Sequence, residues 1–348
     1  MKMMKLVAVL CVVTVLVPAL VIAGNPSKRG TAGAYELLIP VGARGTALAG
    51  SAVASMKGIE AIHWNPAGLS RGSTETSVEA MFSHMEYFAE TKVDYGAVAW
   101  NAGEFGSVGL FIRAFSFGDI EETTEQFPEG TGRLFSPSYI TFGVSYSKLL
   151  TDRISVGFNA KFINESILRT SASGFALDAG VIYYVGGSGA LSGLHFGVTL
   201  KNIGPTMQFT GEDLERAALP PGVAAGSNPQ PLSIPSQSFE LPSSFELGVG
   251  YDATIAADNR LTLMAQFQNM NFSNDEYRLG AEYAFNEMLF LRGGYGFYDG
   301  DVNNFVWGGT FGAGFAYDAG SIGFIIDYAY QTTETFKGTN TFAIRLRF

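Results

Sequence analysis

The sequence predicts an all-β protein, a transmembrane antiparallel β-barrel of about 14 strands with a small-residue, amino-terminal plug inside its lumen. Three observations predict it. Apolar and polar residues alternate with period two from about residue 74 to the end, and short connections alternate with long ones. The 348 residues also include 43 Gly, 28 Phe and 15 Tyr but only 16% charged residues, a composition typical of all-β or membrane proteins and not of ordinary cytoplasmic enzymes.

Residues 1–23 are expected to be a signal peptide. Lys2 and Lys5 precede the apolar stretch 6–22, and small residues stand at the positions that a signal peptidase reads, so we expect cleavage after Ala23. An uncleaved anchor helix is the alternative, because the stretch is about long enough to span a bilayer. A proline within the stretch and the polar residues after it favour cleavage. The mature protein would then reach the bacterial outer membrane.

Charge and composition exclude several kinds of partner and site. Removal of Lys2 and Lys5 reduces 22 basic residues to 20, against 32 acidic residues, and the resulting net charge of −12 disfavours nucleic acid as a partner. The single cysteine excludes a disulfide scaffold, and three histidines leave little material for a metal site. We therefore expect neither a metal nor a cofactor.

Residues 24–73 are expected to form the plug. Small residues dominate and period two is absent, which indicates packed coil and short helix that fit a narrow lumen. Pro66 fixes its own φ and favours extended geometry at Asn65, whose side chain can bond nearby backbone donors. Arg44 is expected to pair with a lumen carboxylate; contact with a ligand is the alternative.

Residues 74–348 are expected to form the barrel. In the segment 154–162, apolar residues alternate with polar residues or glycine, which is the pattern of a strand with two unlike faces. About fourteen such segments occur, an even number that suits a closed barrel with both ends on one side. They start near residues 74, 92, 105, 138, 153, 174, 193, 243, 260, 276, 288, 306, 320 and 340.

The connections alternate in length, as those of outer-membrane barrels do. The tight turns are 101–104, 149–152, 286–287 and 318–320, and the long connections are 118–137 and 204–241. Two turns of about eight residues, 185–192 and 252–259, blur the contrast. Because 204–241 is rich in proline, we expect a stiff extended loop, beginning with two helical turns at 211–219, that covers the barrel mouth or docks a partner.

A secreted β-sandwich would show the same alternation, but the polar faces favour a barrel in lipid. They carry charges of both signs, as expected for a wet or ion-paired lumen. These charges are Asp94, Arg113, Lys161, Asp178, Lys201, Glu246, Arg278, Glu282, Arg292 and Asp327.

The end of the chain also favours a barrel. Its alternate apolar residues finish in an aromatic, which resembles the signal that the barrel-assembly machinery reads in outer-membrane proteins; they are Phe342, Ile344, Leu346 and Phe348. Aromatic residues near segment ends are candidates for interfacial girdles. They are Tyr95, Trp100, Tyr146, Tyr183, Tyr251, Tyr295, Tyr317, Tyr328 and Tyr330.

The plug carries the most specific motif. Residues 43–52 read Ala-Arg-x-x-x-Leu-Ala-Gly-Ser-Ala, and residues 64–69 read Trp-Asn-Pro-Ala-Gly-Leu. This pair resembles the amino-terminal signature of the PorV/PorQ family of outer-membrane proteins, itself similar to FadL-type long-chain fatty-acid transporters. A tryptophan before the asparagine, and residues 56–60 where FadL has an acidic pair, favour PorV/PorQ. The resemblance implies a barrel of about fourteen strands with a hatch that includes Arg44, Gly45, Gly50, Trp64, Asn65, Pro66, Ala67 and Gly68.

Catalytic motifs are weak, so we expect no enzymatic activity. Neither a Gly-x-Ser-x-Gly elbow nor a His-Glu-x-x-His pair is present. His63 falls in the plug, His84 in an outer loop and His195 on a lumen face, whereas a phospholipase-like barrel would need histidine on the lipid side. Residues 299–304 include calcium-ligand types but lack the full spacing, which favours a solvated turn.

Three functions remain. PorV-like proteins act in type IX secretion, so the resemblance implies outer loops that bind secreted cargo or secretion-system proteins. The alternative is a FadL-like passive transporter, whose plug moves and whose hydrophobic ligand leaves through a gap in the wall. A mainly structural barrel is the third. Expected partners are therefore outer-membrane lipid, the barrel-assembly machinery and either a protein or a hydrophobic ligand.

Overall fold

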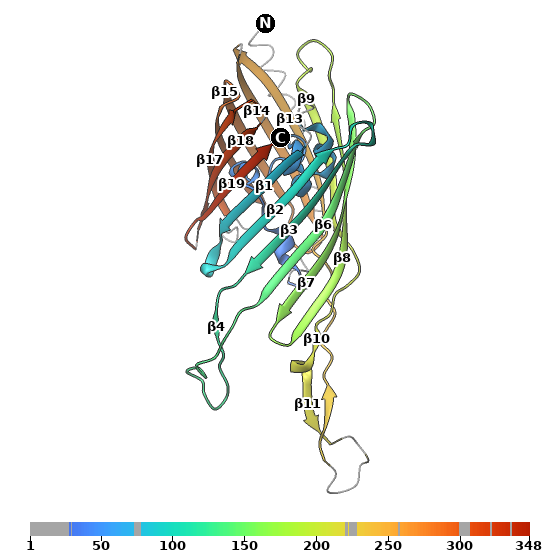
Figure 1. The fold of residues 1–348 in the computed structure, drawn as a ribbon, viewed down its shortest axis with the longest axis vertical. Coiled ribbons are helices and arrows are strands. Elements are labelled where there is room, and N and C mark those ends of the chain that lie inside the picture. Colours follow the sequence, from blue (N-terminus) through green and yellow to red (C-terminus); the bar gives the residue numbers. More distant parts are fainter. Residues whose placement is uncertain are drawn as a thin grey trace.

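The computed structural model describes residue 28 and residues 30–72, 78–219, 222, 228–256, 258–298, 307–320, 322–334 and 336–348. Over these residues the long strands form one antiparallel sheet that closes on itself (Figure 1). The expected signal peptide lies outside them. No helix in this part of the chain is long and apolar enough to cross a bilayer.

Fourteen long strands build the barrel within the described residues, as predicted. Consecutive strands pair with each other, and β1 pairs with β19 to close the barrel. Every strand starts within about four residues of its predicted start, because the alternation that marks it also decides its pairing. The strands are β1 (Val78–Glu86), β2 (Lys92–Asn101), β3 (Ser107–Ser116), β6 (Ser138–Leu149), β7 (Ile154–Ile167), β8 (Thr170–Tyr184), β9 (Leu194–Ile203), β13 (Ser244–Ala256), β14 (Asn259–Met270), β15 (Glu276–Phe285), β16 (Leu289–Tyr298), β17 (Trp307–Asp318), β18 (Gly323–Thr333) and β19 (Thr339–Arg347).

The strands have an apolar outer face and a mixed inner face. On β8, Phe175 and Leu177 point outward and are 63% and 57% exposed, whereas their neighbours Ala176 and Asp178 are buried inside. Large apolar side chains would not stay uncovered over a whole barrel surface in water. The wall therefore fits hydrocarbon, with its polar side chains facing the lumen.

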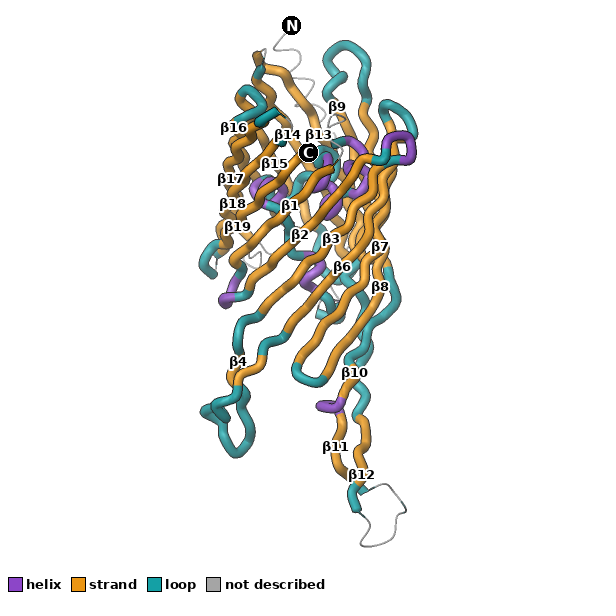
Figure 2. Tube along the Cα trace, viewed as in Figure 1, coloured by secondary structure: helices purple, strands orange, loops and turns teal. Residues whose placement is uncertain are grey.

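The two long connections lie at the same end of the barrel (Figure 2). The carboxyl terminus and the short turns, such as that between β6 and β7, lie at one end; the long connections from β3 to β6 and from β9 to β13 lie at the other, which we call the outer end. The turn predicted at 252–259 is shorter than predicted, because β13 continues to Ala256 and β14 starts at Asn259. The contrast in length is still incomplete, because residues 168–169 alone join β7 to β8 at the outer end, whereas 185–193 join β8 to β9 at the inner end.

Each long connection contains a hairpin. In the first, β4 (Ile120–Glu121) pairs with β5 (Leu134–Phe135); in the second, β11 (Glu215–Ala218) pairs with β12 (Gln230–Ser233). Both hairpins project beyond the barrel wall and do not fold across the mouth (Figure 1).

The helical turns predicted at 211–219 are wrong. β10 (Thr210–Gly211) pairs with the end of β8, one 3-10 turn follows at η7 (Glu212–Leu214), and then β11 begins. Pairing with β12 satisfies the backbone of β11, and this tertiary partner outweighs the local helix propensity.

The plug lies inside the barrel. Its short helices are η2 (Tyr35–Leu38), α2 (Ala43–Ala47), η3 (Gly58–Glu60), α3 (Ala61–Trp64) and η4 (Pro66–Arg71). α2 lies against β17 and β18, while η4 lies against β6 and β7 on another part of the wall. Small residues allow this fit, because alanines at positions such as Ala47 and Ala52 are completely buried.

Candidate functional site

Asn65 attaches the plug to the wall at β8 and β9. Its side chain is fully buried, and its Nδ2 donates to the Val53 carbonyl at 2.8 Å and, at 3.3 Å, to that of Val181 on β8. Its Oδ1 accepts from the Ala67 backbone N–H at 3.1 Å. A Cβ at Gly180 would overlap Asn65 Oδ1, so glycine in the strand lets the plug approach this closely. The asparagine side chain therefore stabilises the turn at residues 65–67 and also binds the barrel wall.

The other predicted hatch residues fit around Trp64. Its Nε1 donates to the Val41 carbonyl at 3.1 Å. A Cβ at Gly45 would overlap the indole ring, and Gly50, at φ +77°, lies next to the same ring. A Cβ at Gly68 would overlap the backbone carbonyl of residue 56. These motif residues thus form one tightly packed unit.

The opposite part of the plug is held by charge. Arg44 Nε lies 2.7 Å from Glu282 Oε2 and its Nη2 lies 2.9 Å from Glu282 Oε1, a two-point contact from α2 to β15. Glu60 Oε2 lies 2.6 Å from Arg345 Nη1 and 3.5 Å from Arg44 Nη1, as ion pairs without hydrogen-bond geometry. Burial alone lowers the pKa of Arg44, but Glu282 and Glu60 outweigh it and raise that pKa above its usual value.

These residues belong to a closed group of three arginines and three carboxylates. Arg292 lies 2.7 Å from Glu282 and 2.6 Å from Asp327, and Arg345 lies 2.9 Å from Asp327. We call Arg44, Glu60, Glu282, Arg292, Asp327 and Arg345 the ionic ring. Its three arginines match its three carboxylates, and Arg260 adds a contact of 3.5 Å to Glu282, which offsets the cost of placing these side chains in the barrel interior.

Sequence reasoning missed two members of the ionic ring. The alternation of the last strand does indicate that Arg345, between Ile344 and Leu346, faces the lumen. Glu60 carried no comparable signal, because period two is absent from the plug and the position of its side chain depends on tertiary packing.

Most other predicted lumen charges are also paired. Lys161 Nζ lies 2.6 Å from Asp178, Lys201 Nζ lies 3.1 Å from Glu246, and Arg278 lies 2.6 Å from Glu276. Arg113 differs: it is buried, and its Nη1 donates to the Ile39 carbonyl at 3.3 Å. Among the described residues Arg113 forms no ion pair within 4.0 Å.

Three placements from the sequence are wrong. Asp94 faces outward, not into the lumen, and its Oδ1 lies 2.7 Å from the Nδ1 of His84. His84 belongs to β1 and not to an outer loop. Tyr95 is a lumen residue and not a girdle residue, because it is only 4% exposed. All three lie near the outer ends of β1 and β2, beyond the apolar part of the wall, where polarity no longer distinguishes the two faces.

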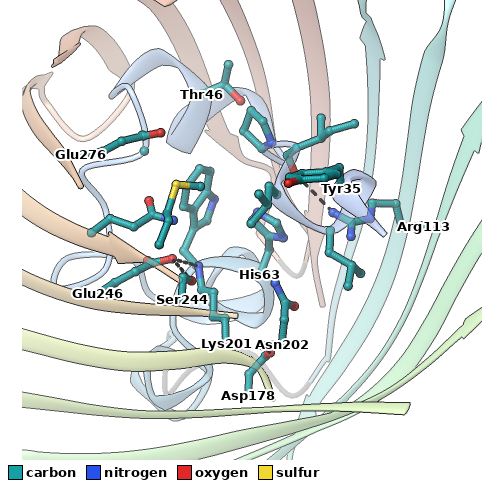
Figure 3. Close-up of a pocket in the computed structure, with 18 of the residues that line it drawn as sticks. Tyr35, Thr46, His63, Arg113, Asp178, Lys201, Asn202, Ser244, Glu246 and Glu276 are labelled. Atoms are coloured by element: carbon teal, nitrogen blue, oxygen red, sulfur yellow. Dashed lines mark hydrogen bonds and ion pairs between the residues drawn. The ribbon is translucent and has the colours of Figure 1, made fainter. Parts of the chain in front are cut away.

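A cavity of about 290 Å³ lies between the plug and the wall (Figure 3). His63 and Trp64 of the plug face Phe111, Arg113 and Lys201 of the wall across it. Burial, with the charge of nearby Lys201, lowers the pKa of His63 well below its usual value, so the imidazole is neutral. The cavity combines aromatic surface with charges of both signs, because Asp178, Glu246 and Glu276 also line it.

A serine and a histidine meet elsewhere in the interior. Ser55 Oγ lies 2.8 Å from His195 Nε2, but His195 Nδ1 contacts the Gly193 carbonyl at 3.0 Å and lies 4.0 Å from Asp252. Ser55 and His195 are buried, and neither lines the cavity. The described residues contain no group of His, Cys, Asp and Glu that fits a metal ion.

The carboxyl-terminal residues lie on the barrel exterior. Phe342 and Ile344 are 51% and 47% exposed on β19, and Leu346 faces the same way. Phe348 follows the strand, and its backbone N–H donates to the Val78 carbonyl at 2.9 Å. The apolar face that the sequence predicts for the last strand is therefore continuous with the rest of the outer wall.

The girdle candidates other than Tyr95 face outward or lie partly exposed. Trp100, Tyr183 and Tyr317 at the inner end are 40%, 39% and 46% exposed, and Tyr146 donates its hydroxyl to the Phe105 carbonyl at 2.6 Å. Aromatic side chains with one polar end suit a boundary between hydrocarbon and water.

Comparisons with known proteins agree with this architecture. The family described as "Type IX secretion system protein PorV" matches residues 24–228. The toluene transporter TodX of Pseudomonas putida has 13% identity, with 88% of this chain and 97% of that chain covered and a TM-score of 0.57. The monoaromatic hydrocarbon channel CymD has 14% identity, with 89% and 97% covered and a TM-score of 0.53.

A FadL homologue of Pseudomonas aeruginosa has 11% identity, with 89% of this chain and 98% of that chain covered and a TM-score of 0.51. No curated protein matches the sequence. At such low identities the solved structures show the shared fold alone. The family match spans more than half of the sequence, and the protein is therefore an outer-membrane β-barrel that belongs to the PorV family.

Proposed function

We propose that this protein is a non-enzymatic barrel that binds a secreted protein at the outer surface, in a role like that of type IX secretion. The observation that carries the proposal is the pair of outer hairpins. They project beyond the wall (Figure 1). They also expose large apolar side chains away from the long strands of the wall. Phe127 and Leu134 near β4 and β5 are 60% and 64% exposed, and Leu219 and Ile234 near β11 and β12 are 54% and 57% exposed. Such surfaces are typical of protein interaction sites.

The fixed plug supports the same proposal. Asn65 holds it to β8 and β9, and Arg44 holds it to β15 through the ionic ring. A barrel whose interior is tied at two separate sites serves as a rigid support for its outer loops. The proposal also assigns residues 1–23 to a signal peptide, 24–73 to the plug and 74–348 to the barrel. Export by the signal peptide and recognition of the last strand by the barrel-assembly machinery belong to this proposal.

The experiment is a pull-down from the native host with matched hairpin variants. One variant carries Phe127→Ser and Leu134→Ser, and its control carries Glu125→Ser and Glu129→Ser on the same exposed hairpin. A second pair applies the same comparison to Leu219 and Ile234. We expect secretion components or cargo to co-purify with the protein and its control but not with the apolar variants. The absence of any protein partner, or equal capture by all variants, would overturn the proposal.

Passive transport of a hydrophobic small molecule is the second candidate. The inner cavity of about 290 Å³ and the fold shared with the hydrocarbon channel CymD and the toluene transporter TodX favour it. Native mass spectrometry of the purified protein tests it, because a tightly bound lipid without a protein partner supports transport. Asn65→Ala should then alter uptake and leave secretion nearly unchanged, and the reverse result would count against transport.

A further inference from the structure

A second depression lies at the outer end, apart from the inner cavity. It is a groove of about 570 Å³, formed by the first described residues of the plug, the outer ends of β3, β6 and β7, and the base of the β9–β13 connection. η2 and Ile39 separate the two, since residues of this segment line both. The groove therefore faces the outside while the plug closes its floor.

Two buried carboxylates line this groove. Glu36 of η2 is 6% exposed and Glu165 of β7 is 3% exposed, and the Oε1 atom of each has no hydrogen-bond partner in the described structure. Glu165 lies within electrostatic range of Glu36. Two neighbouring carboxylates with unfilled acceptor positions are costly to bury unless a cation joins them.

The described residues supply no such cation. Glu36 and Glu165 are the only charged residues among those that line the groove. Arg113 acts on Glu36 electrostatically from the inner side of η2, but its guanidinium is outside ion-pair distance and donates to the Ile39 carbonyl. No cation of the described groove lining therefore neutralises these two carboxyl groups when they ionise.

Aromatic rings form the walls around the carboxylates. On one side the Phe117 ring lies 4.6 Å from that of Phe115 and 4.8 Å from that of Tyr139, between centroids. On the other side the rings of Phe209 and Phe239 lie 5.9 Å apart. Rings around an acidic floor are the arrangement that binds ammonium and guanidinium groups, because ring faces and carboxylates both attract a cation.

We propose that this groove, with Glu36 and Glu165 at its floor, binds an organic cation that carries an ammonium or guanidinium group on an apolar stem. The stem packs on the aromatic walls while the charged group donates to the two free Oε1 atoms. A free amine and a lysine or arginine side chain of another protein offer the same chemistry. The site stands on its own residues and does not depend on the proposed function of the hairpins.

Calorimetric titration of the full chain in detergent tests the site with three small probes. n-Hexylammonium should bind at least about tenfold more tightly than the neutral hexan-1-ol, which has the same stem length, and hexanoate should not bind. Glu36→Gln and Glu165→Gln should each weaken hexylammonium binding by about tenfold or more, while Glu129→Gln on the exposed hairpin leaves it unchanged. Equal binding of hexylammonium and hexanol, or unchanged binding by both groove variants, would overturn the proposal.

A second arm distinguishes the source of the cation. A short acetylated and amidated peptide with one central lysine is compared with its norleucine counterpart, and both compete with hexylammonium. Competition by the lysine peptide alone supports the site and assigns it to a protein side chain; hexylammonium binding without that competition supports a free amine. Arg29→Ala is measured in parallel, because Arg29 directly precedes the groove residues in sequence. Binding that occurs only in that variant would show that the chain fills the groove itself, and would overturn the proposal.

Discussion

Arg44 and Glu282 make a two-point ion pair, 2.7 and 2.9 Å, between the plug and the wall of the barrel. The two residues are 238 positions apart in the chain. Their contact fixes α2 against β15 and connects the plug to the ionic ring.

Arg44→Met should strongly destabilise the folded barrel. The substitution keeps the length of the side chain but leaves Glu282 and Glu60 with one cation fewer in the interior, and loss of one partner from a buried pair costs about 3–5 kcal/mol. The temperature at which the folded band converts to the unfolded band on unboiled SDS gels should fall. Arg133→Met is the control, since Arg133 is 81% exposed beside Glu122, and it should leave that temperature unchanged. Equal behaviour of both variants would contradict the role of the ionic ring.

Asn65→Ala should loosen the plug without unfolding the barrel. The variant removes the donor to the Val53 and Val181 carbonyls and the acceptor for Ala67, with a cost of about 1–3 kcal/mol. Hydrogen exchange should therefore accelerate at residues 53–69 and stay slow in β13 to β16. Asn164→Ala is the matched control, because the side chain of Asn164 donates to the Ser173 hydroxyl in an exposed contact away from the plug. Unchanged exchange in 53–69 would show that Asn65 is not an anchor.

Gly180→Ala should reduce the yield of folded protein far more than Gly293→Ala. An added Cβ at Gly180 would overlap Asn65 Oδ1, whereas at Gly293 its nearest neighbour would be the Thr310 carbonyl oxygen at 3.7 Å, an ordinary contact. Both positions lie in barrel strands, so the comparison isolates the close approach of the plug. The fraction of heat-modifiable protein after refolding measures the effect, and similar fractions would refute the explanation.

Glu36→Gln should stabilise the protein in alkaline solution. Burial, opposed in part by Arg113, raises the pKa of Glu36 above its ordinary value of 4.5. A carboxyl group with a raised pKa favours folding when protonated, and that contribution is lost as the pH rises through the folded-state value. The variant should therefore raise the unfolding temperature at pH 8 and change it little at pH 4, both in the absence of amines. A shift of the same size at both pH values would contradict this assignment.

Period two predicted the barrel wall well because one cause produces both pattern and structure. A strand between lipid and lumen must alternate, and a one-residue change of register would turn Phe175 inward and Asp178 into hydrocarbon. The same reasoning fails at the outer ends of β1 and β2, where Asp94 and Tyr95 exchange their predicted faces. There the outer and the inner surface of the strand both have polar or aromatic surroundings, so the residue type no longer predicts which surface a side chain faces.

The interior site was only partly predictable. The motif identified Arg44 and Asn65, and short-range rules predicted the turn at Pro66. The partners of these residues lie far away in the sequence, so the pairing of Glu60 with Arg345 and the meeting of Glu36 with Glu165 follow only from the closed barrel. Tertiary contacts of this kind leave no local pattern.

The contact between Glu60 and Arg345 also couples the plug to closure of the barrel wall. Glu60 belongs to η3 of the plug, whereas Arg345 belongs to β19, the strand that closes the barrel against β1. Arg345 reaches Glu60 and Asp327 only when β19 is in place, so the strand that completes the wall also supplies the third arginine of the ionic ring. Without β19, Glu60 would keep only its longer contact to Arg44, and Asp327 only its contact to Arg292, so the interior would hold fewer cations than carboxylates.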